Sequence, residues 1–384
     1  MSQRTIVHMD LDTFFVSVER LMDSSLMGKP VIVGGTSNRG VVSACSYEAR
    51  NYGVRSAMPM QKAIQLCPHA IVLKGNLEQY SYYSKLVTEI IKSSVPLFEK
   101  TSIDEFYIDY TGMDRFFGCY KVASELRQKI ISESGLPISF GMSVNKTVSK
   151  IATGEAKPNN QIEVKPGEEK AFLAPLPVAK IPMIGAKMKE KLQKMGIVRI
   201  ETLQNMSLDA LEESFGNSGK MIWRKANGIC NSAVNGEHER KSISKERTFG
   251  TDIVDVDFMH SIIISLVEKL CFQLRKEQKL SACVNIKIRY ADFSTFNLQK
   301  QIAYTSLDHE LQHVALELFN QLYKKELSVR LIGVKFSHLV GCGHQINLFD
   351  NTIERIQLYE TMDKIKTKYG SSILKKASTI SRKK

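Results

Sequence analysis

Two groups of acidic residues in this sequence have the type and setting needed for metal-dependent chemistry. Asp10 follows apolar residues and begins the stretch that runs through DLDTFFVSVE, while Asp104 and Glu105 are adjacent in FEKTSIDEFYIDYTG (residues 98–112). Carboxylates brought together repel one another unless cations neutralise them. Oxygen ligands of this kind suit Mg²⁺, and two such ions ~4 Å apart suit in-line phosphoryl transfer. Any one of these acids alone fits a capping or surface role, but the combination predicts a catalytic metal site.

Polar and basic side chains in two further stretches could bind a triphosphate. SYEARNYGVRSAMP supplies one set and NKTVSKIATGEAKPN the other: Tyr47, Arg50, Arg55, Lys146, Lys150 and Lys157. Cationic and hydroxyl donors of this kind bind phosphate oxygens well. A solvated basic face explains the same residues equally well, and composition alone does not decide between the two.

The first acidic residue lies between a predicted strand over residues 4–9 and a predicted helix over residues 13–23. Asp12 fits the N-cap of that helix, because an aspartate side chain can accept from the free N–H groups of the first turn. This interpretation leaves Asp10 without a structural role at the end of the strand.

The same helix carries an apolar stripe that should bury it. Phe14, Val18 and Leu21 lie at i, i+4 and i+7, which predicts that they face the core. Phe15 is rotated off that stripe, toward the end of the element where Asp10 lies.

The elements that follow predict a split βαβ sheet. Residues 98–112 form a strand pair with SIDE at the bend, 119–133 a helix, 136–144 a strand and 145–156 a helix, with a small insertion at about 25–75. Neighbouring residues on a flat strand point to opposite faces, so Asp104 and Glu105 can serve one site only if the chain bends there. In this sheet the end of the first strand can lie beside that bend, which would bring Asp10 near both.

The rest of the chain predicts a small helical domain, a linker and a second α+β unit. Short helices around Gly185 and Gly196 occupy residues 168–232, and the polar stretch 231–245 lacks periodicity. Helices are predicted within 258–274, 311–322 and 353–369.

Two strands of this last unit alternate apolar and polar residues. In CVNIKIRY (283–290) and IGVKFSH (332–338), one face is apolar and the other carries Lys287, Arg289 and Lys335. Such strands bury one face and present a basic one.

Bulk composition narrows the class of protein. The 384 residues exceed one ordinary core, and a net charge of +13 favours a polyanionic partner. Seven scattered cysteines without a C-x-x-C pair argue against a zinc site or a disulfide framework. The scattered cysteines suggest reduced thiols in a cytoplasmic protein. We find no signal-peptide pattern and no apolar run long enough to span a membrane.

Taken together, four stretches identify a resemblance. HMDLDTFFVSVE, SYEARNYGVRSAMP, TSIDEFYID and SVNKTVSKIATGEAKPN resemble, in order and spacing, a bacterial Y-family translesion DNA polymerase of the DinB type. The resemblance covers at least residues 4–350. It implies an α+β multidomain, right-hand polymerase with a ferredoxin-like palm (1–24 and 76–167), fingers (25–75), helical thumb (168–232), linker (233–243), little finger (244–342) and a tail (343–384).

The resemblance also implies roles for single residues. Asp10, Asp104 and the Leu11 carbonyl look like ligands of two Mg²⁺ ions, and Glu105 looks like the acid that holds the metal at the primer 3′-OH. Phe15 matches the steric gate against ribonucleotides. The other implied nucleotide contacts are Phe14, Ser43, Tyr47, Arg50 and Lys157.

DNA contacts are implied by the thumb and by the basic strand face. IPMIGAKMKEKL, with Gly185 and Lys187, is similar to a helix-hairpin-helix whose helix N-terminus can receive a backbone phosphate; a plain helical turn is the alternative. Lys287, Arg289 and Lys335 would track phosphates without reading sequence. The implied ligands are primer-template DNA and a dNTP, bound by a monomer that lacks a proofreading exonuclease.

The C-terminal stretch HQINLFDN suggests a further partner. Gln345, Leu348 and Phe349 resemble the short peptide by which bacterial polymerases dock on the replication sliding clamp (the β clamp). A polar anchor and two apolar side chains that fill a groove can carry most of such an interaction. The same residues could instead pack the tail onto the little finger.

Two rival functions remain open at the level of sequence. A nucleotidyl cyclase can also use a split βαβ sheet, two metals and a triphosphate, but it does not need a basic α+β domain. A catalytically inactive DNA-binding or clamp-bound scaffold would not need Asp10, Asp104 and Glu105.

Overall fold

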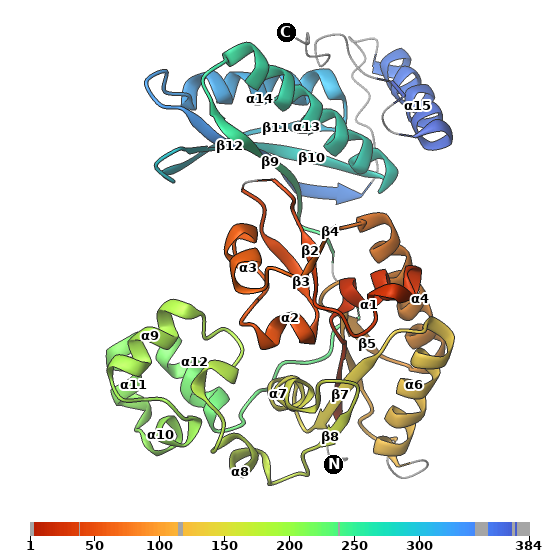
Figure 1. Cartoon of the computed structure of the whole chain (residues 1–384). Coiled ribbons are helices and arrows are strands. Elements are labelled where there is room, and N and C mark those ends of the chain that lie inside the picture. The colour runs from red at the N-terminus through yellow and green to blue at the C-terminus, as the bar shows by residue number, and fades with distance from the viewer. Residues whose placement is uncertain are drawn as a thin grey trace. The chain divides into compact units, whose positions relative to one another are not determined.

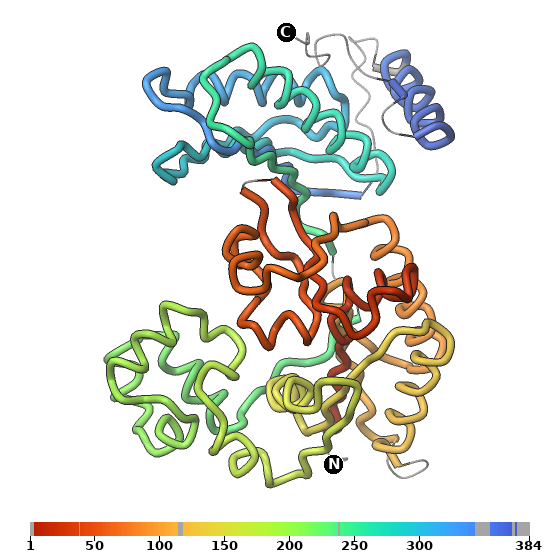
Figure 2. The backbone as a smooth tube through the Cα atoms, in the orientation of Figure 1, coloured from red at the N-terminus to blue at the C-terminus, as the bar shows by residue number. Residues whose placement is uncertain are grey.

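A computed structural model of the chain describes residues 4–37, 39–113, 118–236, 239–341, 352–370 and 373–374. The chain forms two compact units, Met1–His238 and Glu239–Lys384. Their boundary falls inside the predicted linker. Figure 1 labels many of the elements of both units, and the backbone trace in Figure 2 follows the chain through them.

The N-terminal unit is built on a five-stranded sheet that contains the first acidic residue. Its order is β5 (Phe98–Lys100), β6 (Glu105–Asp109), β1 (Ile6–Leu11), β7 (Ile138–Ser143), β8 (Gln161–Glu163). Strand β1 pairs antiparallel with both β6 and β7. This arrangement confirms the predicted split βαβ sheet. Strand β1 runs two residues beyond the prediction, so Asp10 lies within the strand and not after it.

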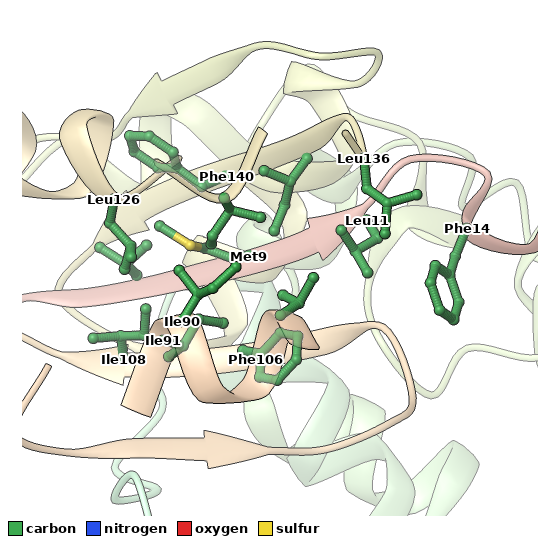
Figure 3. Packing of buried hydrophobic residues seen from close by; sticks show 14 of the residues in the cluster. Met9, Leu11, Phe14, Ile90, Ile91, Phe106, Ile108, Leu126, Leu136 and Phe140 are labelled. Carbon is green, nitrogen blue, oxygen red and sulfur yellow. The ribbon is translucent and has the colours of Figure 1, made fainter. Parts of the chain in front are cut away.

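Helices cover both faces of this sheet. On one face, α4 (Leu77–Ser94) and α6 (Cys119–Ser134) bury their apolar stripes against Met9, Leu11, Phe106 and Phe140, as Figure 3 shows. On the other face, α7 (Lys146–Ala156) contacts β1 through Ser149 and Thr153, whose hydroxyls donate to the carbonyls of Ile6 and His8.

Helix α7 approaches the sheet closely at one glycine. A Cβ on Gly141 of β7 would lie 2.3 Å from the Ser149 carbonyl oxygen and 2.4 Å from the Thr153 nitrogen. Since no larger residue fits, Gly141 fixes how near α7 and its side chains come to β1.

The first helix corrects two predictions. Helix α1 spans Phe14–Met22, and its N-cap is Thr13 in the left-handed region, without a side-chain capping bond. Asp12 is therefore not the N-cap. Phe14 and Val18 are buried as predicted, but Leu21 is 42% exposed, because the helix presents its last turn to solvent.

The predicted insertion has its own small sheet and core. After the short η1 (Ser24–Leu26) come β2 (Val31–Gly34), β3 (Val42–Cys45), α2 (Tyr47–Asn51), α3 (Met60–Leu66) and β4 (Ile71–Lys74), with the sheet order β3-β2-β4. Its core includes Ile32, Val42, Val54 and Met60. The helical segment that follows the palm contains α8 (Glu169–Leu173), η2 (Val178–Lys180), α9 (Ala186–Lys194), α10 (Ile200–Asn205), α11 (Leu208–Phe215) and α12 (Asn217–Ala226).

The C-terminal unit is an antiparallel sheet packed against two helices. Its elements are β9 (Ser242–Ile253), α13 (Val256–Lys276), β10 (Lys279–Tyr290), β11 (Thr295–Thr305), α14 (Asp308–Leu322), β12 (Val329–Gly341) and α15 (Thr352–Tyr369), with the sheet order β11-β10-β12-β9. The predicted helices and the two alternating strands are confirmed. The predicted linker ends inside β9, which begins at Ser242.

Candidate active site

The sheet register brings the separated acids together. Asp10 of β1 is the direct cross-strand partner of Glu105 on β6. Asp104 lies in a bend just before β6, where its carbonyl accepts from the Leu11 N–H at 3.1 Å. The side chain of Asp104 also accepts from the Ser102 hydroxyl at 2.6 Å, and that hydroxyl accepts from the Glu105 N–H at 3.0 Å. The chain therefore bends where the sequence requires it to bend for adjacent acids to serve one site.

Lysines from α7 and the residue after it neutralise part of this acidic charge. The Lys150 ammonium donates to both carboxylate oxygens of Glu105 at 2.6 Å. The Lys157 ammonium donates to Asp10 at 2.5 Å and lies 3.4 Å from the Leu11 carbonyl oxygen. These pairs are half-buried, so solvent screens them less than it would screen a surface ion pair.

The charge on Asp10 is disfavoured despite its lysine partner. The pKa of Asp10 is raised from 3.8 to about 7, mainly by burial. Lys157 lowers the pKa, and the neighbouring charges of Asp104 and Glu105 raise it. A carboxylate with a pKa this high holds a proton or recruits a cation near neutral pH.

The oxygen atoms of the site suit a cation, although the Asp10 and Glu105 carboxylates are paired with lysines in this structure. Among the described residues, no three His, Cys, Asp or Glu side chains are grouped closely enough to hold a metal ion. The Lys157 ammonium, however, already lies between the Asp10 carboxylate and the Leu11 carbonyl, so these oxygens accept a positive group at this point. Carboxylate and carbonyl oxygens are the donors that hard divalent ions prefer.

The paired aromatics after Asp12 have different surroundings. Phe14 is 3% exposed and packs in the core. The nucleotide contact expected of Phe14 stays a prediction. Phe15 is half-buried and stacks on Tyr80 of α4, with ring centroids 4.2 Å apart and an interplanar angle of 11°. Tyr80 is fully buried and donates its hydroxyl to Glu19 at 2.5 Å. Tyr80 was not predicted from the sequence, since nothing in the residues of α4 indicates that this ring faces Phe15.

The residues expected in the fingers have different kinds of contact. The Tyr47 hydroxyl donates weakly to Asp12 at 3.5 Å, and the Arg50 guanidinium lies 5.0 Å from the centre of the Tyr47 ring. Ser43 is exposed on β3. Arg55 instead donates to the backbone carbonyls of Arg50 and Val54 at 2.7 Å, so it supports its own loop.

Asp12 ties the first loop to two other parts of the palm. Its carboxylate accepts from the Ser139 hydroxyl at 2.9 Å and from the Asn159 N–H at 2.5 Å. These bonds replace the capping role expected for Asp12 and hold the chain after Lys157 against the end of β1.

Lys146 is engaged away from the acidic pair. It donates to Glu99 at 2.6 Å and to the Ala233 carbonyl at 3.2 Å, and Glu99 also accepts from the Asn235 N–H at 2.8 Å. Of the three lysines considered for the triphosphate, Lys146 therefore fixes the chain segment that leaves the thumb.

A buried histidine under the acidic pair was not anticipated. His8 is 1% exposed, its Nδ1 lies 2.9 Å from the Thr153 hydroxyl, and its Nε2 lies 4.0 Å from Glu105. Burial, together with Lys150 and Lys157, lowers the pKa of His8 well below its usual value. The ring is therefore neutral at physiological pH. The only signal in the sequence was its position two residues before Asp10, on the same face of β1.

The expected DNA contacts lie on exposed surfaces. Gly185 is the N-cap of α9, and Lys187 in its first turn is exposed. On the sheet of the C-terminal unit, Lys287 pairs with Glu246, Arg289 donates to the Thr295 hydroxyl at 2.9 Å, and Lys335 is exposed. The expected clamp residues Gln345, Leu348 and Phe349 lie outside the described residues.

Comparison with known proteins gives matches along almost the whole chain. The impB/mucB/samB family model matches residues 9–154, and the model of that family's C-terminal domain matches residues 240–348. A model described as the thumb domain of DNA polymerase iota matches residues 179–229.

Curated relatives match over nearly their full length. DNA polymerase IV of Dehalococcoides mccartyi (strain CBDB1) is 39% identical, with 99% of this chain and 98% of the relative covered. DNA polymerase IV of Treponema denticola is 36% identical, with 100% of this chain and 98% of the relative covered.

Two of the matching solved structures show the same fold. A Y-family DNA polymerase chimera of Dbh and Dpo4 has a TM-score of 0.77 at 24% identity, covering 88% of this chain and 100% of the chimera. DinB from Sulfolobus solfataricus has a TM-score of 0.62 at 25% identity, again covering 88% and 100%. In the described part of this chain, no helix has both the length and the apolar character to cross a bilayer.

Proposed function

This chain belongs to the impB/mucB/samB family, the Y family of DNA polymerases, and from that premise we propose that it is a template-directed, low-fidelity DNA polymerase that serves translesion synthesis. It would add dNMP units to a primer 3′-OH and would lack a proofreading exonuclease. The observation that carries the proposal is the cross-strand pairing of Asp10 with Glu105, with Asp104 at the bend beside them. A phosphoryl-transfer enzyme needs such an oxygen-rich cluster at one point of a rigid sheet.

Polymerases of this family depend on a metal, and we propose that the ions here are two Mg²⁺. Asp10, Asp104 and the Leu11 carbonyl would hold them, with Glu105 at the side of the primer 3′-OH. When bound, the ions would supply an activated attacking oxygen and would neutralise charge on the leaving phosphate. The high pKa of Asp10 and the ammonium already held between Asp10 and Leu11 both support this assignment.

The nucleotide site would be formed by side chains around the first helix. Phe15, fixed by its stack on Tyr80, would lie against the sugar and exclude a 2′-hydroxyl. Tyr47, Arg50 and Lys157 would bind the triphosphate, and Ser43 would lie over the nascent base pair. Phe14 would anchor the first helix in the core and support Phe15 at the nucleotide.

Primer-template DNA would be held by backbone contacts. We propose that Gly185 and Lys187 receive a phosphate at the start of α9, and that Lys287, Arg289 and Lys335 follow phosphates across the sheet of the C-terminal unit. These contacts carry no sequence information, which suits an enzyme that must copy any template.

The finer proposals concern partners and location. Gln345, Leu348 and Phe349 would dock on a replication sliding clamp, which would raise the local concentration of a distributive polymerase at the primer end. The protein would act as a cytoplasmic, nucleoid-associated monomer.

Primer extension with Mg²⁺ and dNTPs on undamaged and lesion-bearing templates tests the function. Asp10→Ala, Asp104→Ala and Glu105→Ala should nearly abolish nucleotide addition while leaving primer-template binding largely intact, because these side chains stabilise transition-state charge. Asp109→Asn, a carboxylate at the far end of β6, is the matched control and should retain activity. Near-normal turnover in all three alanine variants would refute the metal assignment.

The same experiment separates the rivals. A nucleotidyl cyclase would consume a nucleoside triphosphate without DNA and form a cyclic product. A scaffold would bind DNA and extend nothing even as the unchanged protein.

A further inference from the structure

An exposed aromatic ring lies at the tip of the hairpin that joins β10 to β11 in the C-terminal unit. Phe293 is 62% exposed, the highest value for any phenylalanine in the described part of the chain. Burial of such a ring is strongly favourable, so a ring exposed at the tip of a hairpin calls for an explanation.

The backbone at this tip is held in a conformation that disfavours phenylalanine. Phe293 has φ +66°, in the left-handed region where glycine or asparagine is the usual choice. Bulky residues in this region are rare and are found where surrounding structure imposes them, often at functional sites.

The surrounding turn does impose this conformation. Asp292 accepts from both the N–H and the hydroxyl of Ser294 at 2.9 and 2.7 Å. Tyr290 accepts from the Phe293 N–H at 3.1 Å and donates its own N–H to the Ser294 carbonyl at 3.0 Å. The ring is therefore presented by a closed turn and not by a loose loop.

One cation lies over the exposed ring. The Arg330 guanidinium lies 4.5 Å from the centre of the Phe293 ring. Arg330 sits where the register of β12 shifts against β9, between Val329 and Leu331, and such a bulge can redirect a side chain. A second pair lies three residues along the same hairpin, where the Lys324 ammonium is 4.7 Å from the centre of the Phe296 ring.

We propose that Phe293 and Arg330 form a stacking platform for an unpaired base of DNA, in the single-stranded part of the template. Proteins that bind single strands combine aromatic rings, on which bases stack, with cations that attract the backbone. Phe293 and Arg330 supply both within one turn. The inference rests on the proposed polymerase function, which makes template DNA the available polyanion.

Two other partners fit these observations less well. Bases in a duplex are already stacked on each other, so duplex DNA offers no free base face to the ring. A protein partner is favoured by a contiguous apolar patch, whereas the groups beside Phe293 are a guanidinium and a polar turn. A single strand can bind through the Phe293 ring, which stacks on a base, and the Arg330 charge, which attracts the backbone.

Binding of two primer-template DNAs tests the platform, without nucleotide or metal. One DNA carries a 5′ template overhang of thymidines, and the other carries an overhang of the same length built from abasic units. The unchanged protein should bind the thymidine overhang about tenfold more tightly, in line with the stacking of one base on one aromatic ring. Phe293→Gly should bind the two DNAs almost equally.

The choice of glycine protects the test from a folding artefact. Glycine adopts φ +66° freely, so Phe293→Gly should keep or raise the thermal stability while it loses base discrimination. Phe293→Tyr should retain the discrimination. Tyr304→Ala, which removes another exposed ring from β11, is the matched control and should behave as the unchanged protein.

Three results would overturn the proposal: unchanged discrimination in Phe293→Gly, an equal loss of affinity for both overhangs, or a loss seen equally with blunt duplex. The last two would indicate a backbone contact instead of stacking. Failure here is distinct from failure of the proposed function, because primer extension by the unchanged protein would then still proceed.

Discussion

Replacing Asp10 by asparagine should stabilise the metal-free fold at alkaline pH even as it removes catalysis. Asp10 has a pKa of about 7 in the folded chain against 3.8 for the free side chain, mainly because it is buried. Each pKa unit corresponds to about 1.4 kcal/mol, so the ionised carboxylate destabilises the fold by about 4 kcal/mol at most. Asparagine copies the protonated form and is free of that penalty at every pH.

The sign of the pH dependence follows from which state binds the proton. Between pH 4 and 7 the folded chain retains a proton on Asp10 that the unfolded chain has released, so stability falls as the pH rises. The advantage of Asp10→Asn over the unchanged protein should therefore grow from under about 1 kcal/mol at pH 4 to about 4 kcal/mol above pH 7. Titrating groups that do not interact with Asp10 cancel in this difference.

Denaturant unfolding in EDTA at several pH values measures the effect directly. Asp23→Asn is the matched control, because hydrogen bonds from Ser25 lower the pKa of Asp23, so this variant should gain nothing. Adding Mg²⁺ at pH 8 should stabilise the unchanged protein more than Asp10→Asn, since ligand binding to the folded state adds stability. A gain that is the same at pH 4 and pH 8, or a loss at pH 8, would refute the reasoning.

Three further predictions concern the nucleotide, the cation and the clamp. Phe15→Ala should admit ribonucleotides in primer extension, because the ring stacked on Tyr80 no longer fills the space at C2′; unchanged sugar discrimination in a well-folded variant would rule out the gate. Lys150→Met should bind Tb³⁺ several-fold more tightly in a luminescence titration, and Mg²⁺ likewise in competition with Tb³⁺, because no ammonium then competes for Glu105; weaker binding would show that Lys150 organises the site instead. Joint replacement of Leu348 and Phe349 by alanine should weaken clamp binding and clamp-stimulated synthesis while synthesis without clamp stays nearly unchanged, and stimulation that survives would assign docking elsewhere.

Local pattern together with the predicted split βαβ sheet was enough to predict that Asp10 lies beside Asp104 and Glu105. An apolar run that ends on Asp10, together with an acidic pair between two apolar strands, allowed only a bent middle strand if one site was to form. The register of Asp10 opposite Glu105, and the bend at Asp104, agree with that prediction.

The N-cap of α1 and two strands of the C-terminal unit were predicted wrongly or missed, because backbone geometry and exposure decide them and residue type does not. Asp12 has the right residue type for an N-cap, but Thr13 in the left-handed region takes that position. Asp12 then points to Ser139 and Asn159, which are far away in sequence. Strands β9 and β11 were missed because most of their side chains are exposed, which removes the alternation that marks a half-buried strand.

The lysines of α7 show why the choice between a phosphate site and a solvated face could not be settled from the sequence. Their spacing places Lys150, Thr153 and Lys157 along the side of the helix segment that faces β1 and β6, opposite Glu105, His8 and Asp10. Lys150 and Lys157 are therefore counter-charges to the acids, a role that depends on Gly141 letting the helix approach the sheet. Under the proposed roles, metal ions would replace the lysines as partners of these carboxylates, and a triphosphate would replace the carboxylates as partner of the lysines. No partly buried charge would then be left unpaired, which would otherwise be strongly destabilising.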